Sequence, residues 1–416
     1  MRQHSQHSDF PGNMPSRRSF LRYAAVAAAA PILTEASFAR AAQKAIAKPT
    51  AAAAARDVWV RPPLDAVIIN ANENPLGPCE AARTAIAKVV PVGGRYDFYG
   101  ETEMLTRTFA SQHNLSEEFI SVYAGSSEPL HFTVLAFTSP ERSLVIADPS
   151  YEAPMMAAMY SGAKIHKVPL TSDYAHDVKA MVAADPNAGV IYICNPNNPT
   201  GTMTSKKDIA WALENKPKGS ILLVDEAYIH FSDAPDVLDL VAAGKDLVVL
   251  RTFSKIYGMA GLRCGFALAR PDLLKKLSPY GENPMPVTGS GAANASLLDA
   301  NLIATRKKFM TETRGETIAW LKQNNYKVIG DSQSNCFMID TRRNGRSVMM
   351  AMRAKNVYIG RTWPIWPNAV RITVGTPEEM AKFRTAFKQV MDAPPAATTA
   401  AELRMHRDGV HYPRLS

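Results

Sequence analysis

The chain has 416 residues, of which 46% are hydrophobic and 20% are charged. This composition is typical of a globular protein of about two or three domains and excludes an intrinsically disordered chain. Lysine and arginine outnumber aspartate and glutamate by 47 to 38, which gives a formal net charge of +9. The four cysteines are widely spaced without a CxxC motif, which excludes a zinc ribbon, an iron–sulfur protein and a disulfide-rich miniprotein.

The first forty residues have the layout of a secretory signal. The pair Arg17-Arg18 precedes an alanine-rich apolar run at 23–33, and small residues suited to cleavage follow. The paired arginines indicate a twin-arginine signal. We therefore expect residues 1–41 to direct the chain through the twin-arginine export machinery to the periplasm. The alternative is a basic arm followed by an alanine-rich helix.

This signal changes the interpretation of the net charge. Residues 1–41 carry five arginines and two acidic residues, so their removal lowers the charge from +9 to +6. The remaining charge is not gathered in a basic run, and we expect no nucleic-acid partner. The apolar run is shorter than the about 20 residues that a spanning helix needs, and no later segment is longer, so we predict no stable membrane insertion.

Apolar runs alternate with helical patterns in the middle of the chain. Strands are predicted at 144–147, 190–194, 221–224 and 247–250, and helices at 205–215 and 271–277. Continuous apolar strands separated by helices imply an α/β fold with a mostly parallel sheet that is covered on both faces. Ligands bind beyond the carboxyl ends of the strands in such sheets.

The C-terminal part has a different pattern, which predicts a smaller α+β domain. Helices are expected at 304–324, 347–355 and 377–391, and strands at 326–329, 336–340 and 370–374. The expected order of parts is a signal at 1–41, an alanine-rich linker at 42–55, the N-terminal part of the small domain at 56–95, a large domain at 96–300, the C-terminal part of the small domain at 301–392 and a flexible tail at 393–416.

Lys255 follows a predicted strand, in a loop rich in serine and glycine, and Arg263 comes eight residues later. A lysine that forms a Schiff base needs desolvation and a neighbouring positive charge to lower its pKa. Most lysines are solvated at the surface, so the neighbouring motifs have to decide between the two interpretations.

Three of those motifs also follow predicted strands. Asp225 closes a strand three residues before Tyr228, and a carboxylate there can hold the protonated nitrogen of a pyridine ring. Residues 195–201 (Asn-Pro-Asn-Asn-Pro-Thr-Gly) form a tight turn that can direct an amide towards a phenolate oxygen. Residues 124–129 lead into a helix whose free N–H groups and serine hydroxyls can bind a phosphate.

This ordered set of motifs resembles the fold-type I, pyridoxal-phosphate-dependent aminotransferases of class I and II, and the histidinol-phosphate aminotransferase family in particular. The resemblance spans residues 64–390 and includes 70–77, 197–201, 225–228, 254–255, 261–265 and 370–375. It implies a mostly parallel seven-stranded sheet in the large domain, a smaller α+β domain and a homodimer. It also implies pyridoxal 5′-phosphate as cofactor and a ping-pong transfer of an amino group, through a Lys255 aldimine, between an amino acid or related amine and a 2-oxo acid.

The resemblance also implies roles for individual residues. Lys255, Asp225 and Tyr228 are expected to be catalytic, with Lys255 carrying a proton and Asp225 binding the pyridine nitrogen. Tyr228 and Asn198 are expected to bind the phenolic oxygen of the cofactor, and Tyr151 to stack on its ring. The residues expected around the cofactor phosphate are Ser126, Ser127, Thr252, Ser254 and Arg263.

Tyr96 is expected to reach the cofactor phosphate of a partner subunit. The family usually has proline after this tyrosine, whereas Asp97 follows it here, so Tyr99 is an alternative for the same role. None of the nine histidines lies in a cluster with ligand spacing, and no metal site is expected.

Arg371 matches the family's arginine for the substrate carboxylate or its replacement. Arg361 lies near a second phosphate-binding arginine of the family, and Asn72 is expected beside the substrate. Two observations argue against histidinol phosphate as the substrate. Histidine biosynthesis is cytoplasmic whereas the signal points to the periplasm, and Trp363 and Trp366 next to Arg361 depart from the family pattern. These tryptophans either line an entrance for a bulky amine or shield a surface turn.

Three alternatives to a histidinol-phosphate aminotransferase remain open. The first is an exported aminotransferase that tailors a secondary metabolite, and the second is another fold-type I enzyme such as a β-lyase or a decarboxylase. The third is a noncatalytic regulator, although such regulators carry an N-terminal DNA-binding module where this chain has its signal.

Overall fold

The computed structural model describes residues 62–281 and 283–395. The expected signal and linker, and all but the first three residues of the expected tail, lie outside the described residues. The described residues lie within one compact unit. In these two ranges no helix has both the length and the apolar character that crossing a membrane requires.

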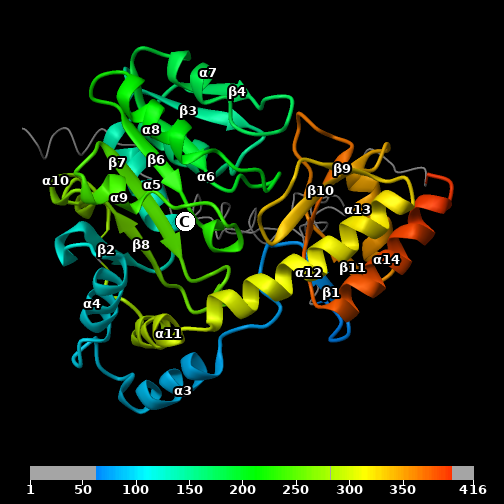
Figure 1. Ribbon diagram of the computed structural model, residues 1–416, viewed down its shortest axis with the longest axis horizontal. Coiled ribbons are helices and arrows are strands. Elements are labelled where there is room, and N and C mark those ends of the chain that lie inside the picture. The colour runs from blue at the N-terminus through cyan, green and yellow to red at the C-terminus, as the bar shows by residue number, and fades with distance from the viewer. Residues whose placement is uncertain (1–61, 282, 396–416) are drawn as a thin grey trace, which may run out of the picture. The chain divides into compact units, whose positions relative to one another are not determined.

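Helices and strands alternate through most of the described chain (Figure 1). The helices are α3 (Glu80–Val89), α4 (Glu101–His113), α5 (Ser127–Phe137), α6 (Ala153–Ser161), α7 (Val178–Ala183), α8 (Lys206–Asn215), α9 (Leu238–Ala242), α10 (Pro271–Leu274), α11 (Val287–Leu298), α12 (Leu302–Gln323), α13 (Gly345–Arg353) and α14 (Pro377–Asp392). The strands are β1 (Val67–Ile69), β2 (Ile120–Tyr123), β3 (Ser143–Asp148), β4 (Ile165–Pro169), β5 (Ala188–Cys194), β6 (Ile221–Asp225), β7 (Leu247–Thr252), β8 (Gly265–Leu268), β9 (Lys327–Ile329), β10 (Cys336–Asp340), β11 (Val357–Ile359) and β12 (Ala369–Thr373).

A seven-stranded sheet forms the centre of the larger part of the molecule. Its strand order is β2-β8-β7-β6-β5-β3-β4. The strands from β7 to β4 pair in parallel, and β8 pairs antiparallel with both β7 and β2. The α/β fold with a mostly parallel seven-stranded sheet is therefore confirmed. Figure 1 shows the helices that surround these strands.

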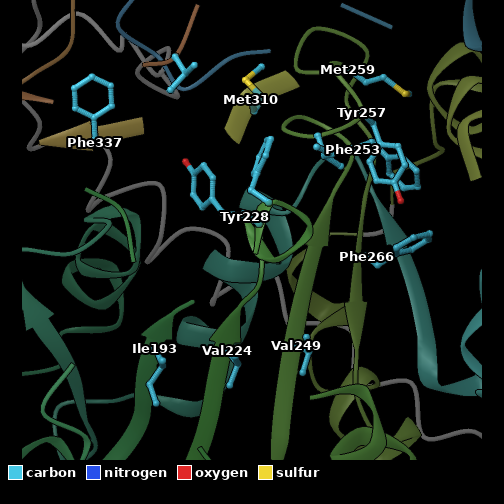
Figure 2. Close-up of a cluster of buried hydrophobic side chains, with 14 of the residues drawn as sticks. Ile193, Val224, Tyr228, Val249, Phe253, Tyr257, Met259, Phe266, Met310 and Phe337 are labelled. Carbon is cyan, nitrogen blue, oxygen red and sulfur yellow. The ribbon is translucent and has the colours of Figure 1, made fainter. Parts of the chain in front are cut away.

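Both faces of the sheet are buried, which explains why its strands are apolar without alternation. Ile193, Val224 and Val249 are register partners on β5, β6 and β7 and belong to one core cluster (Figure 2). Their neighbours Tyr192 and Leu223 belong to a second cluster on the opposite face. Burying each such side chain stabilises the fold by about 1.5–3 kcal/mol, so the central strands and their ends are held rigidly.

Two smaller sheets form the second part of the molecule. One has the antiparallel order β12-β10-β9, and the other consists of β1 paired in parallel with β11. The smaller domain that accompanies the large sheet is thereby confirmed, although the expected domain boundaries remain predictions. The long helix α12 leads from α11 to β9 (Figure 1).

The N-terminal strand and the helix that follows it contact different parts of the fold. The strand β1 pairs with β11 of the smaller part, whereas α3 packs against α11. The chain from residue 70 to residue 79 therefore connects the smaller part of the molecule to the larger part. This path places Asn70 and Asn72 beside the carboxyl ends of the large sheet.

Candidate active site

A cavity of about 540 Å³ lies at the carboxyl ends of β5, β6 and β7. Cys194, Asp225 and Thr252, the last residues of these strands, line it. All predicted site residues except Asn72 and Tyr96 contribute to its wall. Those that do are Ser126, Ser127, Tyr151, Asn198, Asp225, Tyr228, Thr252, Ser254, Lys255, Arg263, Arg361 and Arg371.

Asp225 is buried at the end of β6 and accepts two hydrogen bonds. Its Oδ2 accepts from the Tyr192 hydroxyl at 2.9 Å and its Oδ1 from the backbone N–H of Ala227 at 3.1 Å. Burial raises the pKa of Asp225, while these hydrogen bonds and the charge of Lys255 lower it. The carboxylate is thus oriented for a cationic partner. Tyr192 was not predicted, although a tyrosine within an aliphatic strand is a signal that its hydroxyl needs a partner.

Lys255 lies between the two parts of the molecule. Its Nζ donates a hydrogen bond to the backbone oxygen of Asn72 at 3.0 Å and lies 5.4 Å from the centre of the Tyr228 ring. Burial, followed by the charge of Arg371, lowers the pKa of Lys255 to about 8. About a tenth of this amine is therefore neutral and nucleophilic at pH 7, far more than for a solvated lysine, and the neutral amine is the form that Schiff-base chemistry requires.

Tyr228 directs its hydroxyl towards Asn72. The Tyr228 oxygen accepts a hydrogen bond from Asn72 Nδ2 at 3.0 Å, and Asn72 is held by Thr373 through its backbone N–H and its Oδ1. Burial raises the pKa of Tyr228, so the phenol keeps its proton and can donate it. Asn72 is buried and its side chain positions the Tyr228 hydroxyl, while its expected place beside the substrate remains a prediction.

The predicted phosphate site lies at the start of α5. Ser126 precedes the helix and Ser127 begins it, so their backbone N–H groups are available to an anion. Ser254 Oγ accepts hydrogen bonds from Thr252 Oγ1 at 2.9 Å and from Arg263 Nη1 at 3.4 Å. This arrangement combines a helix N-terminus, hydroxyl groups and a guanidinium around one point.

Gly125 makes the approach of Arg263 to this helix possible. Its φ is +94°, and a Cβ at this position would lie 2.1 Å from Arg263 Nη2. Any side chain would therefore displace the guanidinium and strain the backbone. The glycine in the motif is explained by this contact.

Arg371, on β12, is buried, and its guanidinium donates hydrogen bonds to two neutral oxygens. Its Nη1 donates to Asn198 Oδ1 at 2.9 Å and its Nη2 to the backbone oxygen of Asn70 at 2.7 Å. Among the described residues, its Nε has no hydrogen-bond partner. Neither of these hydrogen bonds goes to a carboxylate, so neither compensates the positive charge of the guanidinium.

Arg361 lies beside Arg371 but has a different environment. It forms an ion pair with Glu152, the residue that precedes α6. Its guanidinium carbon lies 4.6 Å from the centre of the Trp363 ring. Trp363 is only 1% exposed and does not line the cavity. This side chain therefore neither lines an entrance for a bulky amine nor shields a surface turn. Glu152 was not predicted, because nothing in its local sequence pairs it with Arg361.

Tyr96 lies outside the cavity, with 83% of its surface exposed, and Tyr99 is 61% exposed. Whether either tyrosine reaches a partner subunit remains a prediction. The four cysteines are buried and free. Within residues 62–281 and 283–395, no group of three or more His, Cys, Asp or Glu side chains could hold a metal ion.

Comparison with known proteins places the chain in a family. Residues 65–387 match the aminotransferase class I and II family. The histidinol-phosphate aminotransferase of Symbiobacterium thermophilum is 32% identical over 338 residues, which cover 79% of this chain and 91% of the relative. That of Bacillus subtilis strain 168 is 32% identical over 339 residues, with 79% and 92% covered.

A solved structure has the same fold. The histidinol-phosphate aminotransferase of Sinorhizobium meliloti, in complex with pyridoxal-5′-phosphate, matches with a TM-score of 0.72 at 22% identity, covering 79% of this chain and 91% of that one. The family match over most of the described chain and the two relatives at 32% identity agree with the geometry of the cavity. This chain belongs to the class I and II aminotransferase family.

Proposed function

We propose that this protein uses pyridoxal 5′-phosphate to transfer an amino group from an amino acid or related amine to a 2-oxo acid, as histidinol-phosphate aminotransferases do with their substrate. One observation carries the proposal. Lys255, the buried carboxylate of Asp225 and the anion site at the start of α5 all line the same cavity. Lys255 can bind the aldehyde of this cofactor, Asp225 its ring nitrogen and the anion site its phosphate.

The residues present fit the cofactor. A guanidinium, hydroxyl groups and a helix N-terminus gather at Arg263, where the cradle at Gly125 would not admit a side chain. Asp225 offers a carboxylate to the ring nitrogen, and Tyr228 and Asn198 offer polar groups to the phenolic oxygen. When bound, the pyridinium ring delocalises the electron pair that the substrate Cα retains after losing its proton.

The side chains of this chain then bind, orient and carry protons. Arg371 holds the anionic group of the substrate and so fixes the position of its Cα beside Lys255. Lys255 Nζ, with its lowered pKa, removes the proton from the substrate Cα and would deliver it to C4′ of the cofactor. Asp225 keeps the ring nitrogen protonated, and Asn72 holds the Tyr228 hydroxyl in place.

A half-reaction tests this proposal. The protein loaded with pyridoxal phosphate should convert it to the pyridoxamine form when one amino donor is added without an acceptor, and absorbance spectroscopy follows the conversion. Ammonia and carbon dioxide are measured in the same samples. Steady release of either product with multiple turnovers would contradict transamination and favour a β-lyase or a decarboxylase.

The lowered pKa of Lys255 predicts how cofactor loading depends on pH. Only the neutral amine attacks the cofactor aldehyde, so the attachment rate to the apoprotein should rise about tenfold per pH unit below the pKa and level off above about pH 8. Replacing Arg371 by methionine removes a positive charge that lowers this pKa, so the midpoint should move to higher pH. Stopped-flow absorbance at a series of pH values measures both profiles, and identical midpoints would contradict this assignment.

The N-terminal sequence supports an additional proposal about location. The Arg17-Arg18 pair, the short apolar run and the small residues after it support export by the twin-arginine machinery to the periplasm, after the cofactor is loaded. A fusion of residues 1–45 to a reporter tests this directly. Delivery that depends on Arg17 and Arg18 would support the proposal, and retention in the cytoplasm would contradict it.

A further inference from the structure

The two arginines at the substrate end of the cavity do not carry equivalent charges. The guanidinium of Arg371 donates hydrogen bonds to the neutral oxygens of Asn198 and Asn70. Arg361 is paired with the carboxylate of Glu152. The Arg361 and Glu152 side chains are 18% and 32% exposed, so water screens the pair only in part. Together the three side chains present one net positive charge to a ligand.

The indole of Trp363 holds both guanidinium groups in place. Its centre lies 4.6 Å from the guanidinium carbon of Arg361 and 5.7 Å from that of Arg371, within the range of cation–π attraction. The ring is itself fixed, because its Nε1 donates a hydrogen bond to the backbone oxygen of Ser150 at 3.2 Å. The two cations therefore share one rigid support.

Glu152, which pairs with Arg361, lies in the segment that also contains Ser150. It immediately follows Tyr151, which lines the cavity, and precedes the first residue of α6. Its side chain makes no capping hydrogen bond to that helix. The carboxylate therefore does not cap the helix, and it forms an ion pair with Arg361.

We propose, on the basis of the proposed aminotransferase function, that Glu152 sets the charge specificity of this site by neutralising Arg361. A substrate end at which Arg361, Arg371 and Glu152 together carry one net positive charge matches a donor with a single negative charge, such as the carboxylate of an amino acid. A phosphate group carries a charge of about −1.5 to −2 near neutral pH, and at Arg361 it would meet a cation whose charge the Glu152 carboxylate already balances. The favoured donors are therefore amino acids with one carboxylate, in preference to amines that carry a phosphate.

Histidine and histidinol phosphate provide a matched pair of donors. They share the imidazole and the amine but differ in the anionic group, and histidinol serves as the donor without an anion. We expect the wild-type protein to favour histidine over histidinol phosphate in the half-reaction. The Glu152→Gln variant should raise the ratio of kcat/KM for histidinol phosphate to that for histidine about tenfold, which corresponds to about 1.4 kcal/mol.

A binding measurement keeps this inference separate from catalysis. In the pyridoxamine-phosphate form a donor amine cannot transfer its amino group, so calorimetry measures binding alone. Glu152→Gln should tighten histidinol phosphate about tenfold more than histidine or histidinol. Asp272→Asn is the matched control, since Asp272 pairs with Arg270 at the surface at 2.7 Å and neither residue lines the cavity. This control should change neither ratio.

The outcomes separate the inference from the proposed function. Unchanged ratios in Glu152→Gln, or equal changes in Asp272→Asn, would overturn the role of Glu152. If no donor converts the cofactor in any variant, the proposed aminotransferase function fails, whereas the calorimetric comparison still decides the role of Glu152. A gain for histidinol and histidinol phosphate alike would also overturn it, since an effect of charge must depend on the phosphate.

Discussion

Replacing Lys255 by alanine should abolish transamination and remove the absorbance band of the lysine-bound cofactor, while the fold is retained. Loss of a positioned proton-transfer group alone lowers rates by about 10²- to 10⁴-fold, and this substitution also removes the covalent attachment point. The half-reaction with an amino donor, followed by absorbance, measures the loss. Far-ultraviolet circular dichroism and thermal unfolding measure the fold.

The fold should survive because the Lys255 charge does not stabilise it. The lowered pKa means that the folded apoprotein binds this proton less tightly than the unfolded chain does, so this lysine costs folding free energy as the pH falls below 10.5, and the cost is complete below about pH 8. Lys275→Ala is a suitable control, because Lys275 is exposed and does not line the cavity. Turnover by Lys255→Ala at the wild-type rate would show that the proposed mechanism is wrong.

Replacing Asp225 by asparagine should lower the half-reaction rate by about 10²- to 10³-fold, a typical loss for a preorganised electrostatic group. Asparagine keeps the size of the side chain but cannot compensate the charge of a protonated ring nitrogen. The buried site makes this difference large, since little water replaces the missing charge. Rates at saturating cofactor separate the chemical effect from weaker cofactor binding.

Tyr192→Phe is the matched comparison for this prediction. It keeps the Asp225 carboxylate and removes only the hydrogen bond that orients it at 2.9 Å. Its rate loss should be smaller than that of Asp225→Asn, and the absorbance of the bound cofactor should shift with pH differently from wild type. A Tyr192→Phe variant as impaired as Asp225→Asn would mean that orientation, rather than charge, limits the reaction.

The residues that follow the central strands could be predicted from the sequence. Asp225 directly follows one continuous apolar run and Lys255 lies in the loop after another, and such runs form parallel strands whose carboxyl ends meet at one edge. The structure places both residues in one cavity for that reason. Resemblance to a family then supplied their roles, which spacing alone could not.

The supporting contacts could not be predicted, because they join segments that are far apart in the chain. The hydrogen bond from Asn72 to the Tyr228 hydroxyl, for example, forms where the chain leaves β1, which pairs with β11. The ion pair of Glu152 with Arg361 likewise depends on how the segment before α6 meets the chain after β11. Neither partner has a local pattern that identifies the other.

The class of fold, the edge of the sheet that carries the site and the groups available for chemistry there all follow from the amino-acid sequence. Hydrophobic periodicity and strand ends are local properties, and they suffice for those conclusions. Which of the two arginines pairs with a carboxylate becomes visible only in the folded chain. That depends on distances between side chains: Arg371 meets neutral oxygens, whereas Arg361 meets a carboxylate.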